Sequence, residues 1–404
     1  MHSPSFPPAF AAYDFCAPAT ILFGAGRFAE LGGLVRRFGR RAWIVAGRRS
    51  LDACGGPSAV EAVLADAGLI PAFVAASVGE PTVADVATAL AALPVAGREE
   101  AVVVAIGGGA AIDLAKAVAA LATNVAGPLV ASEEQVIDHL EGVGRGLPID
   151  VPPLPLVAVP TTAGTGAEAT RNAVISCPHR RFKKSMRSPL MVPTAALVDP
   201  TLTLSCDRGV TAASGLDCIT QLVESFVCRR RAPLPRALVL DALPRAVAAL
   251  PRVLAAPADA EARAAMSHAA LVSGLALTNS GLGMAHGVAA ALGVECGTPH
   301  GLACAAMLPV ALRVNREACR DDFAALEWAI DPRATGAADR AADAFVARID
   351  ALVAMAGTPR RLADLGLDRG RLGWLAENSG GASMRGNPLD LSPDDLRGIL
   401  ERAY

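Results

Sequence analysis

Net charge is almost absent from this chain: 37 lysines and arginines balance 39 aspartates and glutamates, for a formal charge of −2. Without a basic surplus, the sequence carries no electrostatic signature of nucleic-acid or anionic-membrane binding. Charges, glycines or prolines interrupt every apolar run before it reaches the roughly 18 residues that a membrane-spanning helix needs. A basic segment followed by an apolar one is also missing at the start, so no secretory signal is visible. We therefore expect neither a nucleic-acid nor a membrane partner.

Paired cysteine motifs are missing as well. The nine cysteines are odd in number and include no CxxC pair, and Cys218 and Cys304 lie in apolar, helix-like runs. This usage is typical of reduced, buried thiols and argues against a disulfide framework. We expect a cytoplasmic protein.

The length and the composition describe a large globular chain. At 404 residues it exceeds what one hydrophobic core usually supports, so two domains are expected. A hydrophobic content of 52% with 19% charged residues excludes a disordered or fibrous chain.

The two halves of the chain differ in pattern. Strand-like segments at 41–47, 70–76, 101–107 and 154–160 alternate with helix-like segments at 58–68, 83–93 and 112–124. This alternation predicts an α/β domain over residues 1–200, with a mostly parallel, Rossmann-like sheet covered on both faces. Long Ala/Leu-rich amphipathic segments follow and predict an all-helical domain over residues 201–404.

Two predicted strands run into loops rich in glycine or threonine. Gly107, Gly108 and Gly109 stand between a buried strand and a helix, where backbone N–H groups can approach an anion. The spacing is not GxGxxG, and a tight structural turn is the alternative interpretation. The second loop, PTTAGTGAEA, is expected to lead into another helix whose first turn Glu168 stabilises. Two such loops at the carboxyl ends of parallel strands favour a nucleotide site.

Four polar residues in the second half form a candidate divalent-metal site. Asp217 and Gln221 are four residues apart in a helical pattern and share a face, and His286 and His300 lie in small-residue surroundings. A carboxylate, an amide oxygen and two imidazoles can together bind a divalent ion. Taken singly, each has a simpler interpretation: a helix-terminal charge, a surface amide, or buried hydrogen-bonded imidazoles.

Six motifs in this order carry a resemblance over nearly the whole chain: GGGAAIDLAKAVA, PTTAGTGAEATRNAVI, VDPTLTL, SGLDCITQLVE, GLGMAHGVAAALG and TPHGLACAAMLP. The sequence resembles the iron-containing (group III) alcohol dehydrogenases, which have a dehydroquinate-synthase-like architecture. The resemblance implies an active site in a cleft between a nucleotide-binding and a helical domain, and a homodimer or larger assembly.

The resemblance also implies roles for individual residues. Gly108, Gly109 and Ala110 would hold the pyrophosphate, with Ala110 in place of the usual Ser. Positions that face the cofactor are matched by Asp113, Thr161, Thr162, Thr165 and Lys183. The four metal-ligand positions are matched by Asp217, Gln221, His286 and His300, and we assign catalysis to Asp217, His286 and His300.

Three departures from the family pattern bear on chemistry. Gln221 replaces a His, which predicts weaker binding of Zn²⁺ or Fe²⁺ and better competition by Mn²⁺. Ala290 replaces a second His, four residues after His286, so the proton-relay group is unassigned. Gly47, followed by Arg48 and Arg49, stands where an Asp would grip the adenosine ribose, and this change predicts that NADPH is accepted, either beside NADH or in preference to it. The alternative interpretation is that the two arginines are solvated in a loop.

The sequence thus predicts a metal-dependent, NAD(P)-linked alcohol dehydrogenase or aldehyde reductase with a small alcohol or aldehyde substrate and one Fe, Zn or Mn ion. Two alternatives remain. A metal-independent reductase similar to maleylacetate reductases would explain the lost histidine ligand. A nucleotide-binding homologue without turnover belongs to a different functional class. The retained Asp217 and both histidines favour the metal-dependent enzyme.

Overall fold

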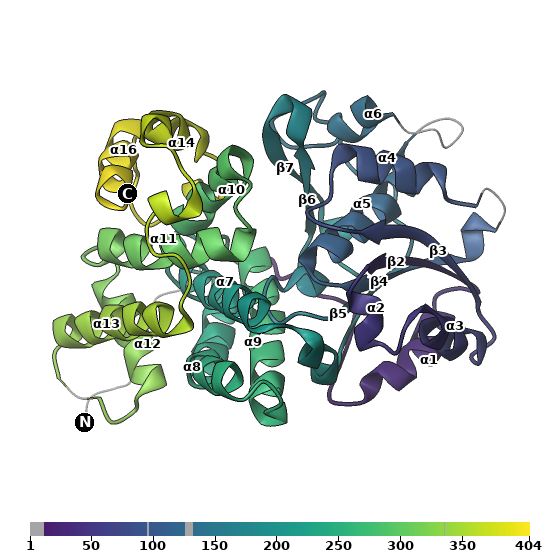
Figure 1. The fold of residues 1–404 in the computed structure, drawn as a ribbon, viewed down its shortest axis with the longest axis horizontal. Helices are drawn as coiled ribbons and strands as arrows, with labels where there is room; N and C mark the ends of the chain where they lie inside the picture. Colours follow the sequence, from purple (N-terminus) through teal and green to yellow (C-terminus); the bar gives the residue numbers. More distant parts are fainter. Residues whose placement is uncertain (1–11, 95–96, 126–131, 335) are drawn as a thin grey trace.

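The computed structural model describes residues 12–94, 97–125, 132–334 and 336–404. Its first half is built around a parallel sheet, and its second half consists of helices that lie beside it (Figure 1). The predicted fold class is confirmed in both halves. None of the helices in the described part of the chain combines the length and the apolarity needed to cross a bilayer.

Six parallel strands form the main sheet in the order β1-β8-β5-β4-β2-β3. Both β4 and β5 are buried along their whole length, as central strands of a covered parallel sheet should be. The strands are β1 (Thr20–Phe23), β2 (Arg41–Gly47), β3 (Ile70–Ser77), β4 (Ala101–Gly107), β5 (Leu156–Pro160) and β8 (Ala195–Val198).

Helices cover both faces of this sheet because successive side chains of a strand point to opposite sides. On β2, Trp43 and Val45 pack into the cluster formed with α4 and α5, whereas Ala42 and Ile44 pack into the cluster formed with α1 and α3. The helices of this half are α1 (Leu31–Arg36), α2 (Ser50–Ala53), α3 (Pro57–Ala65), α4 (Val83–Ala91), α5 (Gly109–Asn124) and α6 (Glu133–Ile137).

The prediction of a helix after the second Gly/Thr-rich loop is wrong. Only a 3-10 turn, Ala167–Ala169, follows Gly166, and the chain then enters β6 (Asn172–Cys177), which pairs antiparallel with β7 (Phe182–Arg187). The alternating burial of β6 is typical of a strand with one covered face. Glu168 is therefore not the stabiliser of a helix start; it is buried, with 2% of its surface exposed.

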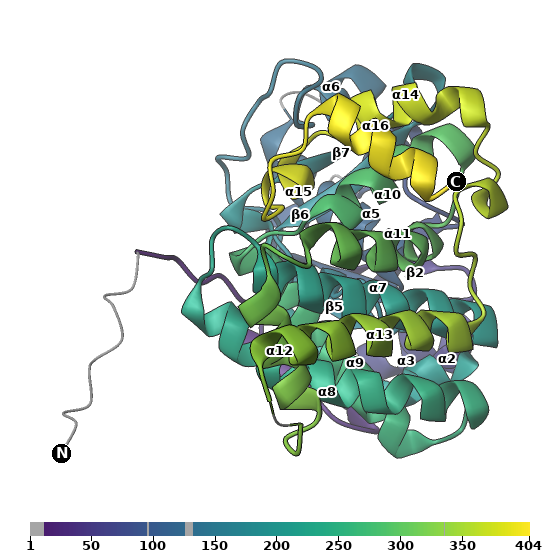
Figure 2. The same cartoon turned by 90° about the vertical axis from the view of Figure 1, so that its left-hand side faces the viewer.

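The helical half packs in two groups, visible from its own side in Figure 2. One cluster joins α7, α8, α9, α12 and α13, and a second joins α10, α14 and α16, with α11 contributing to both. The sequence-derived boundary at residues 200/201 falls within the 3-10 segment Pro200–Ser205 and remains a prediction. The helices are α7 (Arg208–Val227), α8 (Pro233–Ala255), α9 (Ala260–Asn279), α10 (Met284–Cys296), α11 (His300–Asn315), α12 (Arg320–Ile330), α13 (Ala338–Ala356), α14 (Leu372–Asn378), α15 (Ala382–Arg385) and α16 (Pro393–Arg402).

Candidate metal centre and nucleotide loops

Three helices bring a buried polar cluster together in the second half. Asp217 comes from the middle of α7, His286 from the first turn of α10, and His300 from the first residue of α11. The Asp217 Oδ1 atom lies 3.3 Å from His286 Nε2 and 3.8 Å from His300 Nε2. The two imidazole centroids are 5.4 Å apart. The structure thus places these three predicted site residues around one point.

Gln221 contacts the same carboxylate from the other side. Its Nε2 amide donates a hydrogen bond of 3.0 Å to Asp217 Oδ2, and its Oε1 atom accepts one of 2.7 Å from the Ser273 hydroxyl of α9. In this arrangement Gln221 occupies Oδ2 and leaves Oδ1 directed at the histidines.

Glu224, one further turn along α7, fixes the orientation of His286. The imidazole Nδ1 donates to Glu224 Oε2 at 2.7 Å, and the backbone N–H of Ala285 donates to Glu224 Oε1 at 2.7 Å. The carboxylate therefore binds both the side chain and the N-terminal backbone of α10, where negative charge is favourable. Because Nδ1 is engaged by Glu224, Nε2 is the imidazole nitrogen left to face Asp217.

The cluster's pKa values follow from burial opposed by neighbouring charges. Burial lowers the pKa of His300 to about 4 despite the nearby Asp217 carboxylate, which keeps this imidazole neutral. Burial also disfavours protonation of His286, but Cys304, Asp217 and Glu224 outweigh it and raise the pKa of His286 above its ordinary value. For Asp217, burial is likewise outweighed, here by the two histidines, and its pKa is lowered.

Several atoms of this cluster lack hydrogen-bond partners although they are buried. Asp217 Oδ1, His286 Nε2 and His300 Nδ1 are all in this state among the described residues. An unsatisfied buried carboxylate oxygen or imidazole nitrogen costs free energy, on the order of 1–3 kcal/mol or more for a charged group. A divalent cation bound by Asp217 Oδ1 and His286 Nε2 would remove that cost for these two atoms, so the cluster fits a metal ion.

The first glycine loop lies at the carboxyl ends of β2, β4 and β5. Gly107 has φ +156°, and a Cβ there would lie 2.6 Å from the Ala111 Cβ. The backbone N–H of Thr161 donates to the Gly107 carbonyl at 3.0 Å, and the Thr161 hydroxyl donates to Ser50 Oγ at 3.0 Å. Gly47 ends β2 beside them, since a Cβ on it would lie 2.6 Å from Ser50 Oγ. Three strand ends therefore meet at one sheet edge, where open α/β sheets bind ligands.

The second loop packs between the first loop and the helical half. A Cβ on Gly109 would lie 2.7 Å from Thr165 Oγ1, and one on Gly108 would lie 3.2 Å from Thr162 Oγ1. On its other side, a Cβ on Gly166 would lie 2.5 Å from the backbone of Gly274 in α9. Both loops thus require bare backbone at their points of contact.

The remaining predicted cofactor residues have defined partners. Asp113 accepts from the Val174 N–H of β6 at 3.0 Å and lies 3.5 Å from Lys116 Nζ, so it forms an ion pair within α5. The Lys183 ammonium lies 2.5 Å from Glu80 Oε1, and a Cβ added to Gly293 of α10 would lie 3.7 Å from it. Ala110 is in the first turn of α5, Ala290 is in α10, and Arg48 is exposed just after β2.

Sequence reasoning missed Glu224, Ser273 and Cys304. The spacing contained a signal for two of them: Glu224 follows Asp217 by seven residues, and Cys304 follows His300 by four, so each shares a helix face with a residue that was identified. Nothing in the sequence indicates that Ser273 of α9 meets Gln221.

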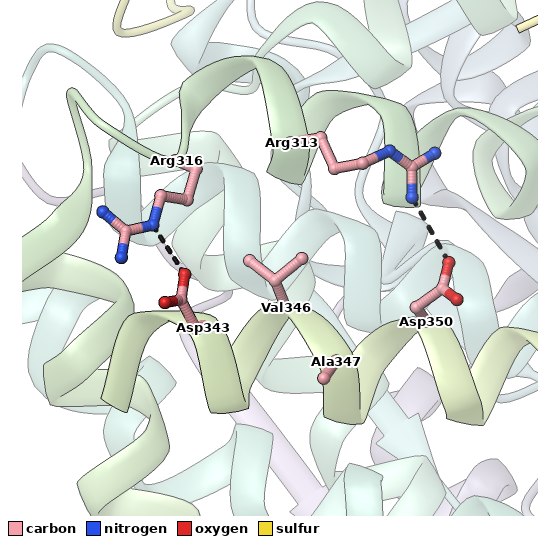
Figure 3. Close-up of a pocket in the computed structure, with 6 residues that line it drawn as sticks. All are labelled: Arg313, Arg316, Asp343, Val346, Ala347 and Asp350. Carbon is pink, nitrogen blue, oxygen red and sulfur yellow. Dashed lines mark hydrogen bonds and ion pairs between the residues drawn. The ribbon is translucent and has the colours of Figure 1, made fainter. Parts of the chain in front are cut away.

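A surface pocket between α11 and α13 shares no residue with this cluster. Arg313 pairs with Asp350 and Arg316 with Asp343 across its walls (Figure 3). Because each cation already has a neighbouring carboxylate, we assign the pocket no catalytic role.

The structure thus combines a parallel α/β half, whose loops meet at one sheet edge, with a helical half that contains a buried carboxylate–imidazole cluster. The family described as "Iron-containing alcohol dehydrogenase" matches residues 18–200, and "Fe-containing alcohol dehydrogenase family, C-terminal" matches residues 211–404. The chain belongs to the iron-containing alcohol dehydrogenase family.

Individual relatives match over nearly full length. A probable alcohol dehydrogenase EutG of Escherichia coli (strain K12) is 30% identical over 96% of this chain and 94% of its own. Lactaldehyde reductase of the same strain is 29% identical over 95% of this chain and 98% of its own. The crystal structure of a 1,3-propanediol oxidoreductase superposes with a TM-score of 0.86 at 28% identity, covering 98% of this chain and 100% of its own. The chain is an oxidoreductase that acts on CH–OH or aldehyde groups, and its family implies a nicotinamide cofactor and a divalent metal.

Proposed function

We propose that this enzyme interconverts a small alcohol and its aldehyde, using a divalent ion held by Asp217, His286 and His300. The observation that carries the proposal is the convergence of buried, unpartnered ligand atoms on one point: Asp217 Oδ1 lies 3.3 Å from His286 Nε2, and neither atom has a hydrogen-bond partner. When bound, the ion would act as a Lewis acid toward the substrate oxygen.

The chain's own residues prepare that site. Glu224 holds Nδ1 of His286 and thereby presents Nε2 to the cluster. The His300 side chain keeps 30% of its surface exposed, whereas Asp217 and His286 are almost fully enclosed, so a substrate would reach the cluster from the His300 side.

For the cofactor we propose that the loops at 107–109 and 161–165 hold the pyrophosphate, at the N-terminus of α5. The glycines allow the two loops to pack closely, since a Cβ on Gly109 would lie 2.7 Å from Thr165 Oγ1. The hydroxyls of Thr162 and Thr165 lie beside this turn and are the polar groups that we propose for the cofactor. Arg48 and Arg49 are exposed directly after Gly47, which supports selection of NADP(H) through its 2′-phosphate.

Elemental analysis of protein purified without chelator or nickel tests the metal. We expect about one Fe, Zn or Mn per chain and nicotinamide-dependent reduction of aldehydes. Asp217→Asn should remove the metal and lower kcat/KM about a thousandfold, since several kcal/mol of charge stabilisation are lost. Asp241→Asn is the matched control, because Asp241 also meets an imidazole, 3.2 Å from His268, but is exposed on α8. An active protein without metal would instead indicate a metal-independent reductase.

The ratio of kcat/KM for NADPH to that for NADH tests the cofactor. Replacing both Arg48 and Arg49 by Ala should lower this ratio about tenfold or more, because hydrogen bonds to a charged group contribute about 1.5–3 kcal/mol. Arg27→Ala, which replaces a partly exposed arginine of the same half that is paired with Glu30, should leave the ratio unchanged. A wild-type preference for NADH that the double variant does not alter would refute the assignment.

A further inference from the structure

A thiol completes the ring of ligand atoms around the metal cluster. Cys304 lies one turn after His300 on α11, so both side chains share a helix face. Its Sγ is 3.6 Å from His300 Nε2, and the ligand atoms of Asp217, His286, His300 and Cys304 all lie within 4.8 Å of one another. The thiol is fully buried, as are most of its neighbours: Asp217 is 1% exposed and His286 5%.

Gln221, by contrast, directs its amide nitrogen and not its oxygen toward Asp217, and an amide nitrogen does not ligate a cation. Its amide N–H₂ points to Asp217 Oδ2, and its oxygen accepts the Ser273 hydroxyl. A cation beside Asp217 would therefore meet amide protons on that side. The unpartnered oxygen of Asp217 is Oδ1, the atom next to the histidines. The side of the Asp217 carboxylate that is available to a cation is therefore the side that faces the two histidines and Cys304.

We propose that Cys304 Sγ is the fourth protein ligand of the divalent ion and that Gln221 is a positioning residue that holds Asp217. The inference rests on the proposed metal-dependent function and deepens it. As the sulfur–metal bond forms, the S–H bond breaks and its proton passes to solvent, since the thiolate is the ligand form of cysteine.

This ligand set reverses the metal preference expected from an amide oxygen. A thiolate is soft, and with two imidazoles it favours Zn²⁺ or Fe²⁺ over the harder Mn²⁺. It also adds a second negative charge, so that Asp217 and Cys304 together balance a divalent ion. With Gln221 as the fourth ligand, one positive charge would remain.

Cobalt replacement tests the thiolate directly, without an activity assay. The enzyme is stripped of metal by a chelator and reloaded with Co²⁺, and cobalt per chain is measured beside the near-ultraviolet spectrum. We expect one cobalt per chain and an intense thiolate-to-cobalt charge-transfer band. In Cys304→Ser the band should vanish, while cobalt still binds with affinity reduced about tenfold or more, at least the loss that even outer partners of a ligand cause.

Two further samples keep the interpretation unambiguous. Cys218→Ala removes another fully buried thiol, next to Asp217 in the chain but outside the cluster, and should keep both the band and the affinity. In the zinc-loaded wild type, X-ray absorption should show a sulfur atom at about 2.3 Å from the zinc. This measurement does not depend on whether a variant folds.

The possible failures are distinguishable. If the wild type binds neither cobalt nor zinc, the metal-dependent function itself fails. If it binds one ion but shows no charge-transfer band and no sulfur neighbour, the function stands and the Cys304 assignment is overturned. A band that survives in Cys304→Ser and disappears in Cys218→Ala also overturns the assignment.

Discussion

The two proposed ligand sites of this enzyme, one in each half of the chain, are built in opposite ways. In the α/β half, the loops after β4 and β5 present bare backbone, because Gly107, Gly108 and Gly109 lie where any side chain would strike a neighbour. In the helical half, three helices direct carboxylate, imidazole and thiol groups to one buried point. The loops that we propose for the nucleotide are therefore built from residues without side chains, whereas the site that we propose for the metal ion is built from charged and polar side chains.

This difference predicts how each half fails. A substitution in the loops adds atoms and should weaken cofactor binding through steric overlap, with little effect on the metal. A substitution in the cluster removes a charge or a donor and should weaken metal binding, with little effect on the cofactor. Substitutions at Glu224 and Gly109, one in each half, test this separation.

Glu168 is an exception to this difference, because it is a buried carboxyl group in the α/β half. Burial raises its pKa to about 7, although the nearby Lys116 opposes the shift. Because the folded pKa lies above the unfolded value, this group's contribution to stability is complete below about pH 4.5 and is lost as the pH rises through 7. The full penalty at pH 8 amounts to about 3 kcal/mol, at 1.36 kcal/mol per pKa unit.

Glu168→Gln removes this titration. Urea unfolding at pH 5 and pH 8 should show the variant gaining up to about 3 kcal/mol on the wild type between the two pH values. Glu99→Gln, an exposed glutamate of the same half, serves as the control and should follow the wild type. Parallel stability curves for Glu168→Gln and the wild type would show that Glu168 is ionised at little cost.

The buried Glu168 also marks the limit of the sequence reasoning about the fold. The six-stranded parallel sheet was predictable in outline, because apolar runs such as 41–47 and 101–107 alternate with amphipathic segments. The β6–β7 hairpin was not, since the TTAGTGAEA turn is also a plausible helix start. Whether a chain leaves such a turn as helix or strand depends on what covers it, here Lys116 and α9.

The second prediction concerns the orientation of a ligand by its outer partner. Glu224→Gln keeps the shape but removes the charge that holds His286 Nδ1 at 2.7 Å. We expect metal affinity to fall about 10–100-fold, the usual loss for such partners, while the Kd for the cofactor stays unchanged. Titration of the stripped enzyme with Zn²⁺ measures this.

Glu327→Gln is the control for Glu224→Gln. Glu327 is another buried glutamate of the helical half, 2% exposed and paired with Arg348, outside the cluster. Its loss should lower stability and leave zinc affinity intact. Equal zinc affinities for Glu224→Gln and the wild type would mean that the backbone of α10, rather than Glu224, orients His286.

Only part of the candidate metal site could be predicted from the sequence. Helical spacing places Asp217 and Gln221 on one face, and the small-residue surroundings of His286 and His300 make these two imidazoles candidate ligands. The resemblance to a known family then joins the four residues into one ligand set. Which end of the Gln221 amide faces the carboxylate depends on Ser273, a residue 52 positions away on another helix. The sequence does not identify Cys304 as a ligand, because it lies in an apolar helical run and cysteine is common in buried cores.

The last prediction tests the backbone side of the comparison. Gly109 begins α5, and a Cβ there would lie 2.7 Å from both Oγ1 and Cγ2 of Thr165. Gly109→Ala must therefore displace Thr165, and overpacking of this kind typically costs about 1–3 kcal/mol. We expect the Kd for the nicotinamide cofactor, measured by calorimetry, to rise about tenfold, and metal per chain to stay constant.

Gly373→Ala on α14 is the control, because it adds the same methyl group into open space. It should leave cofactor binding unchanged while stabilising the helix by about 0.5–1 kcal/mol. Metal loss in Gly109→Ala would show that the loop and the cluster are coupled, and the two halves would then not prepare for their ligands independently.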